Sequence, residues 1–533
     1  MLPPSQTYEQ LRENFQWKFP QPYNMGWDVC DKWVETDADR TAIIDLTCGS
    51  RKDFSFGELK TLSNQLANHL NAKGIRYGDR VGVFRTQSIW TAAAHIAIWK
   101  MGAVSIPLFT LFGEEALETR LENSGAKAIV TDAVHAEKQG EVFARLADLE
   151  HVIVPEMDGI ETLSAEFEIA ETNAETPGLI IYTSGTTGPP KGALHAHRVM
   201  RGHVPGVEFF QNFPMQGDDV FWTPADWAWI GGLMNILMPS LYNGIPVVAS
   251  AMTKFNGKEC QQIINDGGVR NVFFPPTALR ILKAEGNGLS GLRSVGCGGE
   301  PLGEEMLNWG RENLGLTINE FYGQTECNLV LATCNNLFEP KPGFIGKQVP
   351  GFEVAVIDES GDLTDEEGDI AVRRGCASMM LEYWNNPKAT KEKFRQDKIG
   401  EDWLLTGDRG VREGEYFRFV GRDDDVITSA GYRIGPAEIE NCMLKHEAVA
   451  SVGVIGKPDE ERTEIVKAYV LLKDGYRGSD DLVGEMRNFV RTRLSAHEYP
   501  REIEFVDALP MTVTGKIIRK ELKARATKEL ENQ

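Results

Sequence analysis

Short apolar runs alternate with segments of helical character through the first half of the chain. The runs are typical of strands and cover residues 80–84, 103–108, 126–131, 178–182, 244–248 and 269–274. Helices are predicted over residues 88–101, with Ser88 as the N-cap, and over residues 114–124. Repeated units of a strand and a helix predict a mainly parallel sheet whose faces are covered by helices.

The pattern changes after Lys341, where the β segments become shorter and tight polar turns separate them. Residues 352–357 and 368–374 are examples, and they predict a small barrel or distorted sheet. A polar stretch, residues 421–425 (GRDDD), then precedes a last βαβ-like region that ends in a basic helix. The predicted fold class is therefore α/β, with a large N-terminal domain of βα-layered sheets and a β-barrel-like subdomain, followed by a small α+β C-terminal domain.

Composition and charge narrow the functional classes. The 533 residues exceed one ordinary core and suggest roughly three to four structural units. A hydrophobic content of 42% and a charged content of 25% are typical of globular proteins. The formal net charge of −22 argues against a nucleic-acid or anionic membrane partner, because such partners require a basic face. Small anionic ligands stay compatible with it, since a few local cations and loop amides suffice to bind them.

Signals for targeting and for metal binding are weak. The eight cysteines are scattered without metal-ligand spacing, and we expect them to be reduced and mostly buried. The N-terminus has no apolar signal region, and no run of about 18 apolar residues occurs. These features predict a cytoplasmic protein without integral membrane association. We expect His195 and His197 on a helix, where positions two apart diverge, so they are not a metal pair.

One glycine-rich stretch indicates a phosphate site. Residues 182–192, YTSGTTGPPKG, combine three glycines with several hydroxyl groups, and the backbone amides of such a loop can converge on an anion. With a strand before it and a helix predicted over residues 193–200, the loop should form a strand-to-helix turn. Two prolines separate Gly188 from Lys191, and Gly192 replaces the Ser or Thr of a Walker A loop, so this loop is of another kind. A solvent-exposed linker is the alternative interpretation.

Stretches in a fixed order along the chain resemble the adenylate-forming superfamily, which includes acyl-CoA synthetases, firefly-type luciferases and the adenylation domains of peptide synthetases. Within it, the chain is similar to medium-chain-type acyl-CoA synthetases. The matching stretches are residues 182–192, 298–301 (GGEP), 322–326 (YGQTE), 406–408 (TGD), 429–440 (SAGYRIGPAEIE) and 510–516 (PMTVTGK). A single match would be weak, whereas several in order are specific.

The resemblance also implies a domain organisation. Residues 1–422 would form the domain that binds ATP and the acyl group, and residues 423–425 would form a hinge with Asp424 as its pivot. Residues 426–533 would form a mobile domain that rotates between two half-reactions and carries Lys516. Three consecutive aspartates could equally form a solvated turn.

Most of the matched residues are assigned by the resemblance to ATP. The implied ATP-binding residues are Thr183, Ser184, Gly185, Thr186, Thr187, Lys191, Gly299, Glu300, Pro301, Tyr322, Gly323, Gln324, Asp408, Arg422 and Arg433. Among them, Tyr322 is expected to stack on adenine, and Asp408, at what should be a strand end, accepts the ribose hydroxyl protons. Taken alone, each of these short motifs would suit an ordinary turn.

Catalytic roles are implied for Thr325, Glu326 and Lys516. Thr325 is expected at the α-phosphate and Glu326 at Mg²⁺, a hard cation that prefers oxygen ligands. The Lys516 ammonium can bridge a carboxylate oxygen and the α-phosphate, which orients the attack and stabilises charge that grows on phosphorus. Gly431 is expected to pack against the pantetheine of CoA.

An acyl pocket is implied over residues 223–232, which resemble the lining of the acyl tunnel in acyl-CoA synthetases. The pocket residues are Trp227, Trp229, Ile230, Gly231 and Gly323. Acetyl-CoA synthetases carry a tryptophan at the position of Gly323 that closes the pocket, so the glycines here should leave space open. We therefore expect an acid larger than acetate, with about 0.8 kcal/mol gained for each buried methylene.

The resemblance as a whole implies an ATP-dependent carboxylate–CoA ligase that forms acyl-CoA, AMP and pyrophosphate through an acyl-adenylate. Its substrates would be a short-to-medium, branched or aryl acid, ATP and CoA, with Mg²⁺, and a homodimer is left open. One alternative is an adenylating enzyme with another acceptor, in which Asp226 could bind a substrate ammonium. The other is a nucleotide-binding sensor without activity.

Overall fold

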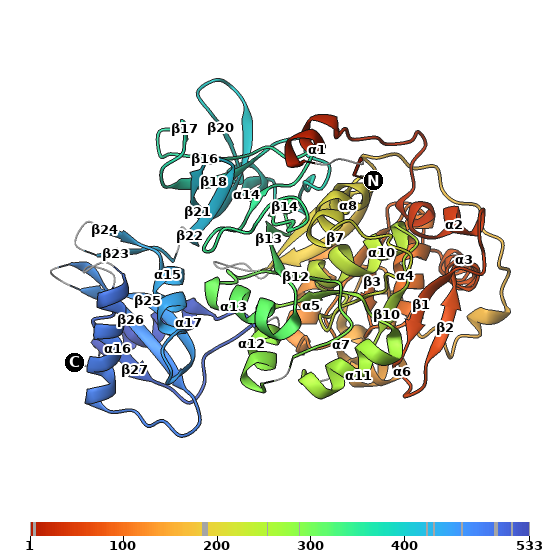
Figure 1. The fold of residues 1–533 in the computed structure, drawn as a ribbon. Helices are drawn as coiled ribbons and strands as arrows, with labels where there is room; N and C mark the ends of the chain where they lie inside the picture. Colours follow the sequence, from red (N-terminus) through yellow and green to blue (C-terminus); the bar gives the residue numbers. More distant parts are fainter. Residues whose placement is uncertain are drawn as a thin grey trace.

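The computed structural model describes residues 2–3, 7–183, 190–252, 254–286, 288–422, 425–429, 432–459, 462–494, 499–512 and 515–531. Within these ranges the named strands form four sheets. Figure 1 shows three of them in the larger part of the molecule and the C-terminal sheet, in blue, beside it.

The two largest sheets have parallel centres. The nine-stranded sheet runs in the order β15 (Lys347–Gln348), β14 (Asn328–Ala332), β13 (Ile318–Gln324), β12 (Ser294–Gly298), β11 (Asn271–Phe274), β9 (Phe221–Trp222), β10 (Val247–Ala249), β1 (Thr41–Asp45) and β2 (Lys52–Ser55). The seven-stranded sheet runs in the order β19 (Glu382–Tyr383), β8 (Lys191–Ala196), β7 (Pro177–Thr183), β4 (Val104–Pro107), β3 (Arg80–Phe84), β5 (Ala128–Thr131) and β6 (His151–Ile153). Strands β13 to β1 of the first and β7 to β6 of the second are parallel, whereas antiparallel strands complete each sheet.

Helices cover both faces of these two sheets, which confirms the expected layered α/β fold. Helices α3, α4 and α8 lie between the sheets, because their apolar residues share one core cluster with strands of both. Every residue of α4 is buried, as expected for a helix that is packed on all sides. Helices α5 and α7 cover the outer face of the seven-stranded sheet, and α11, α12 and α13 cover the outer face of the nine-stranded one. Their bounds are α3 Phe56–Ala72, α4 Ile89–Lys100, α5 Glu114–Ser124, α7 Gly140–Arg145, α8 Val199–Phe210, α11 Gly257–Gly267, α12 Pro276–Ala284 and α13 Glu304–Trp309.

The third sheet is antiparallel, in agreement with the short β segments expected after residue 341. Its strands are β17 (Leu363–Thr364), β16 (Val354–Ile357), β18 (Gly368–Arg373), β21 (Asp402–Glu413) and β20 (Phe394–Gln396), with β22 (Tyr416–Arg422) paired to β21. The β21–β22 hairpin ends at Arg422, immediately before the C-terminal part of the chain.

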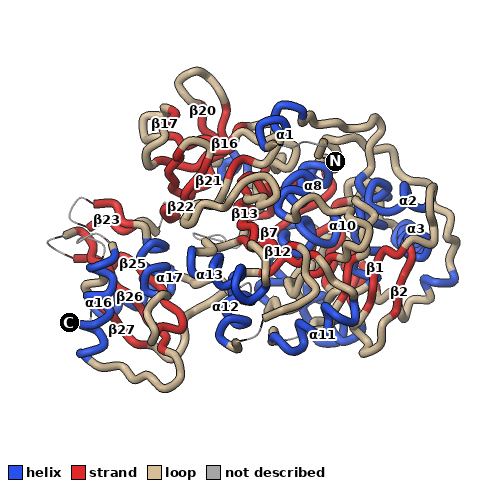
Figure 2. Tube along the Cα trace, viewed as in Figure 1, coloured by secondary structure: helices blue, strands red, loops and turns tan. Residues whose placement is uncertain are grey.

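A small α+β C-terminal domain follows. Its sheet contains β24 (Tyr432–Ile434), β23 (Ile427–Ser429), β26 (Thr463–Leu472), β25 (Val449–Asp459) and β27 (Glu502–Phe505). Helices α15 (Pro436–Met443) and α16 (Asp480–Arg493) share one apolar cluster with this sheet, and α17 (Arg519–Glu531) packs through another (Figure 2). The domain boundaries proposed from the sequence, 1–422, 423–425 and 426–533, stay predictions.

Short helical segments complete the described chain. They are α1 (Tyr8–Asn14), α2 (Lys32–Val34), α6 (Ala133–Lys138), α9 (Ile230–Gly232), α10 (Met238–Tyr242), α14 (Pro387–Glu392), the 3-10 helix Ile160–Thr162, and the π-helical turns Trp27–Asp31, Leu233–Leu237 and Gly310–Leu314. None of the helices in the described ranges is both long enough and apolar enough to cross a bilayer.

Several local predictions are confirmed. Ser88 caps α4 by accepting a hydrogen bond from the Thr91 backbone amide, and α5 spans the predicted residues. All eight cysteines lie in the described residues as thiols outside any disulfide, and seven of them are buried. The helix predicted over residues 193–200 is wrong, because residues 191–196 form β8 and α8 begins only at Val199. Strand β8 pairs with β7 on one side and β19 on the other, and these two ladders override the high helix propensity of alanine and leucine.

Candidate active site

The glycine-rich loop connects two adjacent antiparallel strands. Thr183, at the end of β7, is the register partner of Lys191, at the start of β8, and its Oγ1 donates to the Lys191 carbonyl at 3.4 Å. The expected strand-to-helix turn is therefore wrong, and a helix N-terminus does not contribute to this site. The predicted ATP-binding residues Ser184, Gly185, Thr186 and Thr187 lie outside the described residues. The hairpin fixes both ends of the loop, including Lys191.

Lys191 lies beside Tyr383, which is not among the residues that the resemblance implies. The Lys191 Nζ atom is 5.3 Å from the centroid of the Tyr383 ring. The Tyr383 hydroxyl in turn donates a hydrogen bond to Glu326 Oε1. Glu326 follows β13 and is 8% exposed, while Thr325 beside it is partly buried. The structure therefore brings together the lysine of the loop and the predicted metal-binding carboxylate, with Tyr383 between them.

A second group of predicted residues surrounds Asp408. The Tyr322 hydroxyl donates to Asp408 Oδ2 at 2.5 Å, and Gln324 Nε2 donates to the Thr406 carbonyl at 3.0 Å and is 3.4 Å from the same Oδ2. Arg422 is the register partner of Asp408 on β22. Burial raises the pKa of Asp408, and the Arg422 guanidinium opposes this increase. The Asp408 carboxylate is thus held among donors, as a ribose ligand would require.

Asp408 does not stand at a strand end, which corrects the prediction. Strand β21 continues from Asp402 to Glu413, and Asp408 lies near its middle. Gly407 before it has φ +76°, a left-handed conformation that glycine adopts without strain, and the ladder to β18 shifts register between Leu405 and Arg409. This irregularity interrupts the pleat at the residue that faces Tyr322.

Lys516 approaches the predicted nucleotide site from the C-terminal domain. Gly299 has φ +104°, and a Cβ atom there would lie 3.7 Å from both Lys516 Cε and a ring carbon of Trp229. Desolvation lowers the pKa of Lys516 below its ordinary value, and the carboxylates of Glu300 and Asp408 oppose this decrease.

Further contacts hold the C-terminal domain at this position. A Cβ atom on Gly515 would lie 2.7 Å from a side-chain carbon of Thr277, which shows how closely the Lys516 loop packs on α12. Lys445 Nζ is 3.3 Å from Glu304 Oε2 at the start of α13. Nearby, Arg280 and Glu300 form an ion pair at 2.7 Å within the N-terminal part. The loop before α13, which contains Pro301, therefore forms part of the contact between the two domains.

Three predicted residues of the hinge and the C-terminal domain lie wholly or partly outside the described part of the chain. Asp424, the expected hinge residue, and Gly431, the expected CoA contact, lie outside the described residues. Arg433 belongs to β24, but its side chain lies outside the described part as well. These three assignments stay predictions.

Two aromatic rings, those of Trp229 and Phe273, form an aromatic wall beside Gly299. Gly299 belongs to residues 298–301, the segment predicted to bind ATP and called here the nucleotide ledge. The Trp229 and Phe273 rings have centroids 5.5 Å apart. A Cβ atom on Gly231 would lie 2.9 Å from each of them, so glycine at this position allows the two rings to meet. Trp227 is completely buried and belongs to the core, and Ile230 is buried next to the wall. Because Trp229 also lies against Gly299, this wall is continuous with the approach of Lys516.

The expectation of open space at Gly323 is wrong. A Cβ atom on Gly323 would lie 1.6 Å from the Asn328 carbonyl oxygen and 2.8 Å from Leu329 Cα. The backbone of the β13–β14 hairpin fills this position, and the ladder shifts register between Tyr322 and Gly323. No side chain can project from residue 323 into an acyl pocket without a change in this hairpin.

The two histidines that follow the glycine-rich loop do not lie on a helix. His195 belongs to β8 and His197 follows the last residue of this strand, so the argument that they diverge on a helix is wrong. Both are completely buried, and burial lowers the pKa of each to about 3. No cluster of three or more His, Cys, Asp or Glu side chains with metal-binding geometry occurs in the described ranges. A single carboxylate, Glu326, fits Mg²⁺, which commonly takes one or two protein carboxylates and completes its shell with phosphate and water.

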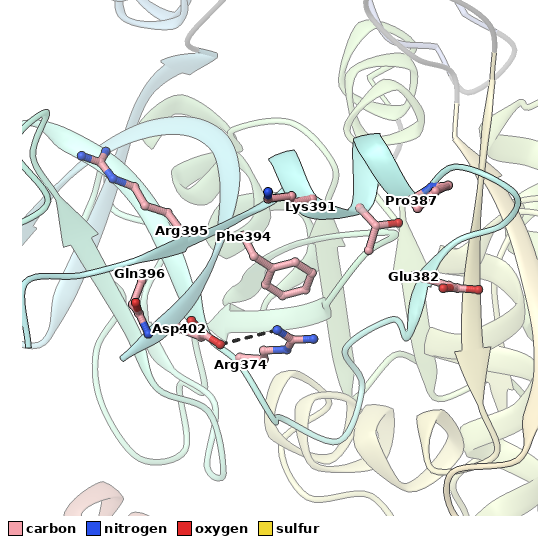
Figure 3. Close-up of a pocket in the computed structure, with 9 residues that line it drawn as sticks. Arg374, Glu382, Pro387, Lys391, Phe394, Arg395, Gln396 and Asp402 are labelled. Atoms are coloured by element: carbon pink, nitrogen blue, oxygen red, sulfur yellow. Dashed lines mark hydrogen bonds and ion pairs between the residues drawn. The ribbon is translucent and has the colours of Figure 1, made fainter. Parts of the chain in front are cut away.

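A separate hollow of about 400 Å³ lies between α14, β20 and the beginning of β21. Figure 3 shows Arg374 beside the Asp402 carboxylate, and the Arg374 guanidinium is 4.6 Å from the centroid of the Phe394 ring. None of the residues predicted to bind substrate lines this hollow. Because the predicted substrate-binding residues lie elsewhere, we assign it no part in the reaction.

Comparisons with known proteins match both parts of the chain. Residues 30–384 match the family of AMP-binding enzymes, and residues 438–516 match the AMP-binding enzyme C-terminal domain. Acetyl-coenzyme A synthetase of Bacillus subtilis (strain 168) is 33% identical over 97% of this chain and 95% of its own length. The mitochondrial acyl-coenzyme A synthetase ACSM3 of Mus musculus is 31% identical over 97% and 93%.

Solved structures agree with these relatives. An acyl-CoA synthetase from Brucella canis is 30% identical, with a TM-score of 0.73 and coverage of 99% of this chain and 100% of that one. The anthranilate CoA ligase AuaEII in complex with anthranoyl-AMP is 25% identical, with a TM-score of 0.87 and coverage of 96% and 99%.

Proposed function

This chain belongs to the AMP-binding enzyme family and is an AMP-forming acyl-CoA or aryl-CoA ligase, and we propose that its acid is a short-to-medium, branched or aryl carboxylate larger than acetate. We also propose that ATP is used with Mg²⁺ and that the acyl-adenylate is transferred to free CoA. The cytoplasmic location stays a prediction, since the relatives include both bacterial and mitochondrial proteins. A homodimer stays a prediction as well.

The proposed reaction has two steps. A carboxylate oxygen of the acid attacks the α-phosphorus of ATP, a new P–O bond forms, and the bond to pyrophosphate breaks. The thiol sulfur of CoA then attacks the acyl carbon of the acyl-adenylate, the thiol proton is lost, and AMP leaves. Both steps depend on position and on neutralisation of charge more than on covalent participation of the protein.

Each group of residues would contribute one part. The Lys516 ammonium would lie between the attacking carboxylate and the α-phosphate, and Lys191 would bind the outer phosphates. Asp408 would accept the ribose hydroxyls, with Tyr322 beside it against the base. Glu326 would hold Mg²⁺, which when bound neutralises charge on the phosphate oxygens.

The single observation that best supports this function is the approach of Lys516 to Gly299, where Trp229 also lies. At Gly299, Lys516 of the C-terminal domain lies next to the segment predicted to bind the nucleotide and next to the aromatic wall predicted to bind the acid. The carboxylates of Glu300 and Asp408 favour its charged form. This is the arrangement that adenylation requires, because the acid and the α-phosphate must react within reach of one ammonium.

The preferred size of the acid is inferred from the wall and not from an empty space at Gly323. Trp229 is partly exposed and offers an apolar ring surface that a methyl group alone cannot cover, while the completely buried Phe273 supports this ring. Each further methylene placed against Trp229 should contribute about 0.8 kcal/mol, or roughly a fourfold gain in affinity. One relative is named for acetate and one solved structure for anthranilate, so relatives alone leave the size open.

The test is pyrophosphate release by the purified protein with MgATP against acids from acetate to decanoate, with isobutyrate and benzoate, each with and without CoA. We expect release with acids of four to eight carbons or an aryl acid, and sustained turnover only when CoA is present. A clear preference for acetate would contradict the proposed size. Release that is indifferent to CoA would favour another acceptor, and no release with any acid would favour a nucleotide sensor.

The alternative with an amino-acid substrate finds no support in the geometry around Asp226. Its Oδ1 accepts a hydrogen bond from the Ala228 amide at 2.8 Å, and burial raises its pKa to about 6. A carboxyl group that caps its own turn and is readily protonated is a poor partner for a substrate ammonium.

A further inference from the structure

Tyr383 belongs to none of the short motifs that carry the resemblance to the adenylate-forming enzymes, yet it contacts two residues of the predicted phosphate and metal sites. Its hydroxyl donates to Glu326 Oε1, and its ring faces the Lys191 ammonium at 5.3 Å. The tyrosine is 4% exposed, so both contacts are made away from bulk solvent. The three residues are widely separated in the sequence, and only the tertiary structure brings them together.

Strand pairing determines where Tyr383 points. In the ladder between β19 and β8, Tyr383 is the partner of Ala193, and the Trp384 amide donates to the Gly192 carbonyl at 2.7 Å. Side chains two positions apart on a strand share a face, so Ala193 and Lys191 point to the same side of β8. Tyr383, opposite Ala193, is therefore a diagonal neighbour of Lys191 on that side.

A second set of contacts determines where Glu326 points. The Met380 amide donates to the Glu326 carbonyl at 2.8 Å, which ties the segment before β19 to the end of the β13 motif. In the described part of the chain, Oε1 is the Glu326 carboxylate oxygen that accepts a hydrogen bond, and the donor is Tyr383. This bond restricts rotation of the carboxylate and leaves Oε2 to face other ligands.

Tyr383 also keeps two opposite charges apart. Within the described residues, neither Lys191 nor Glu326 forms an ion pair, although both contact the same tyrosine. The ring face attracts the ammonium, while the hydroxyl satisfies the carboxylate. If Lys191 and Glu326 paired directly, the lysine would be drawn from the phosphates and the carboxylate from the metal.

We propose that Tyr383 is a positioning residue that orients the Glu326 carboxylate toward the metal of MgATP through its hydroxyl, and orients the Lys191 ammonium toward the phosphates through its ring. This inference rests on the proposed use of MgATP. In the proposed arrangement, Tyr383 would touch neither the nucleotide nor the acid. It would act through Lys191 and Glu326, which bind the phosphates and the metal.

The two contacts can be separated by two variants and one binding measurement. ATP affinity is measured by isothermal titration calorimetry, once with excess Mg²⁺ and once in EDTA. Tyr383→Phe removes the hydroxyl and keeps the ring, so it should reduce the gain in affinity that Mg²⁺ provides by about tenfold, as loss of a group that orients a metal ligand commonly does. It should leave metal-free ATP affinity nearly unchanged.

Tyr383→Leu removes the ring as well, so it should weaken metal-free ATP binding in addition. Tyr8→Phe is the matched control, because Tyr8 is equally buried and its hydroxyl donates to the Gln348 carbonyl at 2.9 Å, away from the site. This control should leave the Mg²⁺ gain unchanged. The KM for MgATP should follow the binding data in the wild type and the variants.

A Mg²⁺ gain in Tyr383→Phe equal to that of the wild type would overturn the inference. An equal loss of affinity with and without metal would overturn it too, since a merely structural role predicts that result. Failure of the proposed function is a different outcome: the wild type would release no pyrophosphate with any acid, whereas the calorimetric comparison would still decide the role of Tyr383.

Discussion

The buried carboxyl group of Glu320 provides the sharpest test of the structure. Glu320 lies in the middle of β13 and is 8% exposed, and its Oε1 accepts a hydrogen bond from the Leu302 amide at 3.2 Å. Burial raises the pKa of Glu320 to about 8, and the bond from Leu302 opposes this increase only in part. The perturbation is Glu320→Gln, which keeps an acceptor for the Leu302 amide and removes the titration.

The sign of the effect follows from proton binding. The ordinary pKa of 4.5 applies to the unfolded chain, so between pH 4.5 and about pH 8 the folded protein binds more protons than the unfolded one. The contribution of Glu320 to stability is therefore complete below pH 4.5 and is lost as the pH rises to about 8, by about 1.4 kcal/mol for each pH unit. Across the whole interval the loss reaches roughly 5 kcal/mol as an upper limit.

The assay compares urea unfolding of the wild type and Glu320→Gln at pH 5, 6, 7 and 8. The variant should become progressively more stable relative to the wild type as the pH rises. The slope of this difference against pH measures the titration of Glu320 in the folded protein. Burial keeps the pKa of Cys297, on the neighbouring strand, well above its ordinary value, so its thiol does not titrate in this interval. Glu312→Gln, at an exposed position, controls for the removal of a carboxylate. A difference that stays constant from pH 5 to pH 8 would refute the reasoning.

Three further substitutions test the site. Lys516→Ala should lower acid-dependent pyrophosphate release by about 10²–10³-fold while ATP binding by calorimetry changes little, and an unchanged rate would contradict the catalytic role. Asp408→Ala should raise the KM for ATP by at least about tenfold, because the Tyr322 hydroxyl loses its charged acceptor and the ribose loses its carboxylate. An unaltered KM in steady-state kinetics would contradict the role of Asp408 in ATP binding. Gly323→Ala should destabilise the protein by about 1–3 kcal/mol or more in thermal unfolding, because its Cβ would lie 1.6 Å from the Asn328 carbonyl oxygen, and a variant as stable as the wild type would show that the hairpin adapts.

The layered α/β fold could be predicted because each element has a local signal. The strand at Arg80–Phe84 is apolar and β-branched, and α4 begins with Ser88, whose hydroxyl satisfies an amide of the first turn. The error at residues 193–200 has the opposite cause. Strand β8 is stabilised by hydrogen bonds to β7 and β19, and β19 lies almost 190 residues away, so no local pattern could reveal it.

The candidate site was predictable only where a residue belongs to a short motif. Tyr322, Asp408 and Lys516 each lie in such a motif, and the structure brings Tyr322 and Asp408 into contact. Tyr383 has no motif of its own in the sequence, and a glutamate at position 320 resembles any other charged residue in a strand. Their contacts arise from strand register, which depends on partners that are remote in the chain.

By its amino-acid sequence alone, this chain determined the alternation of strands and helices outside residues 193–200, the family resemblance and the chemical types at the site. These depend on spacing and residue type within a few turns of backbone. Tertiary structure alone decided that Tyr383 stands between Lys191 and Glu326, that the hairpin closes over Gly323, and that Lys516 reaches Gly299 from another domain. The physical reason is that each of these contacts joins segments brought together by sheet pairing and domain packing, whose free energy belongs to the whole core and not to any local stretch.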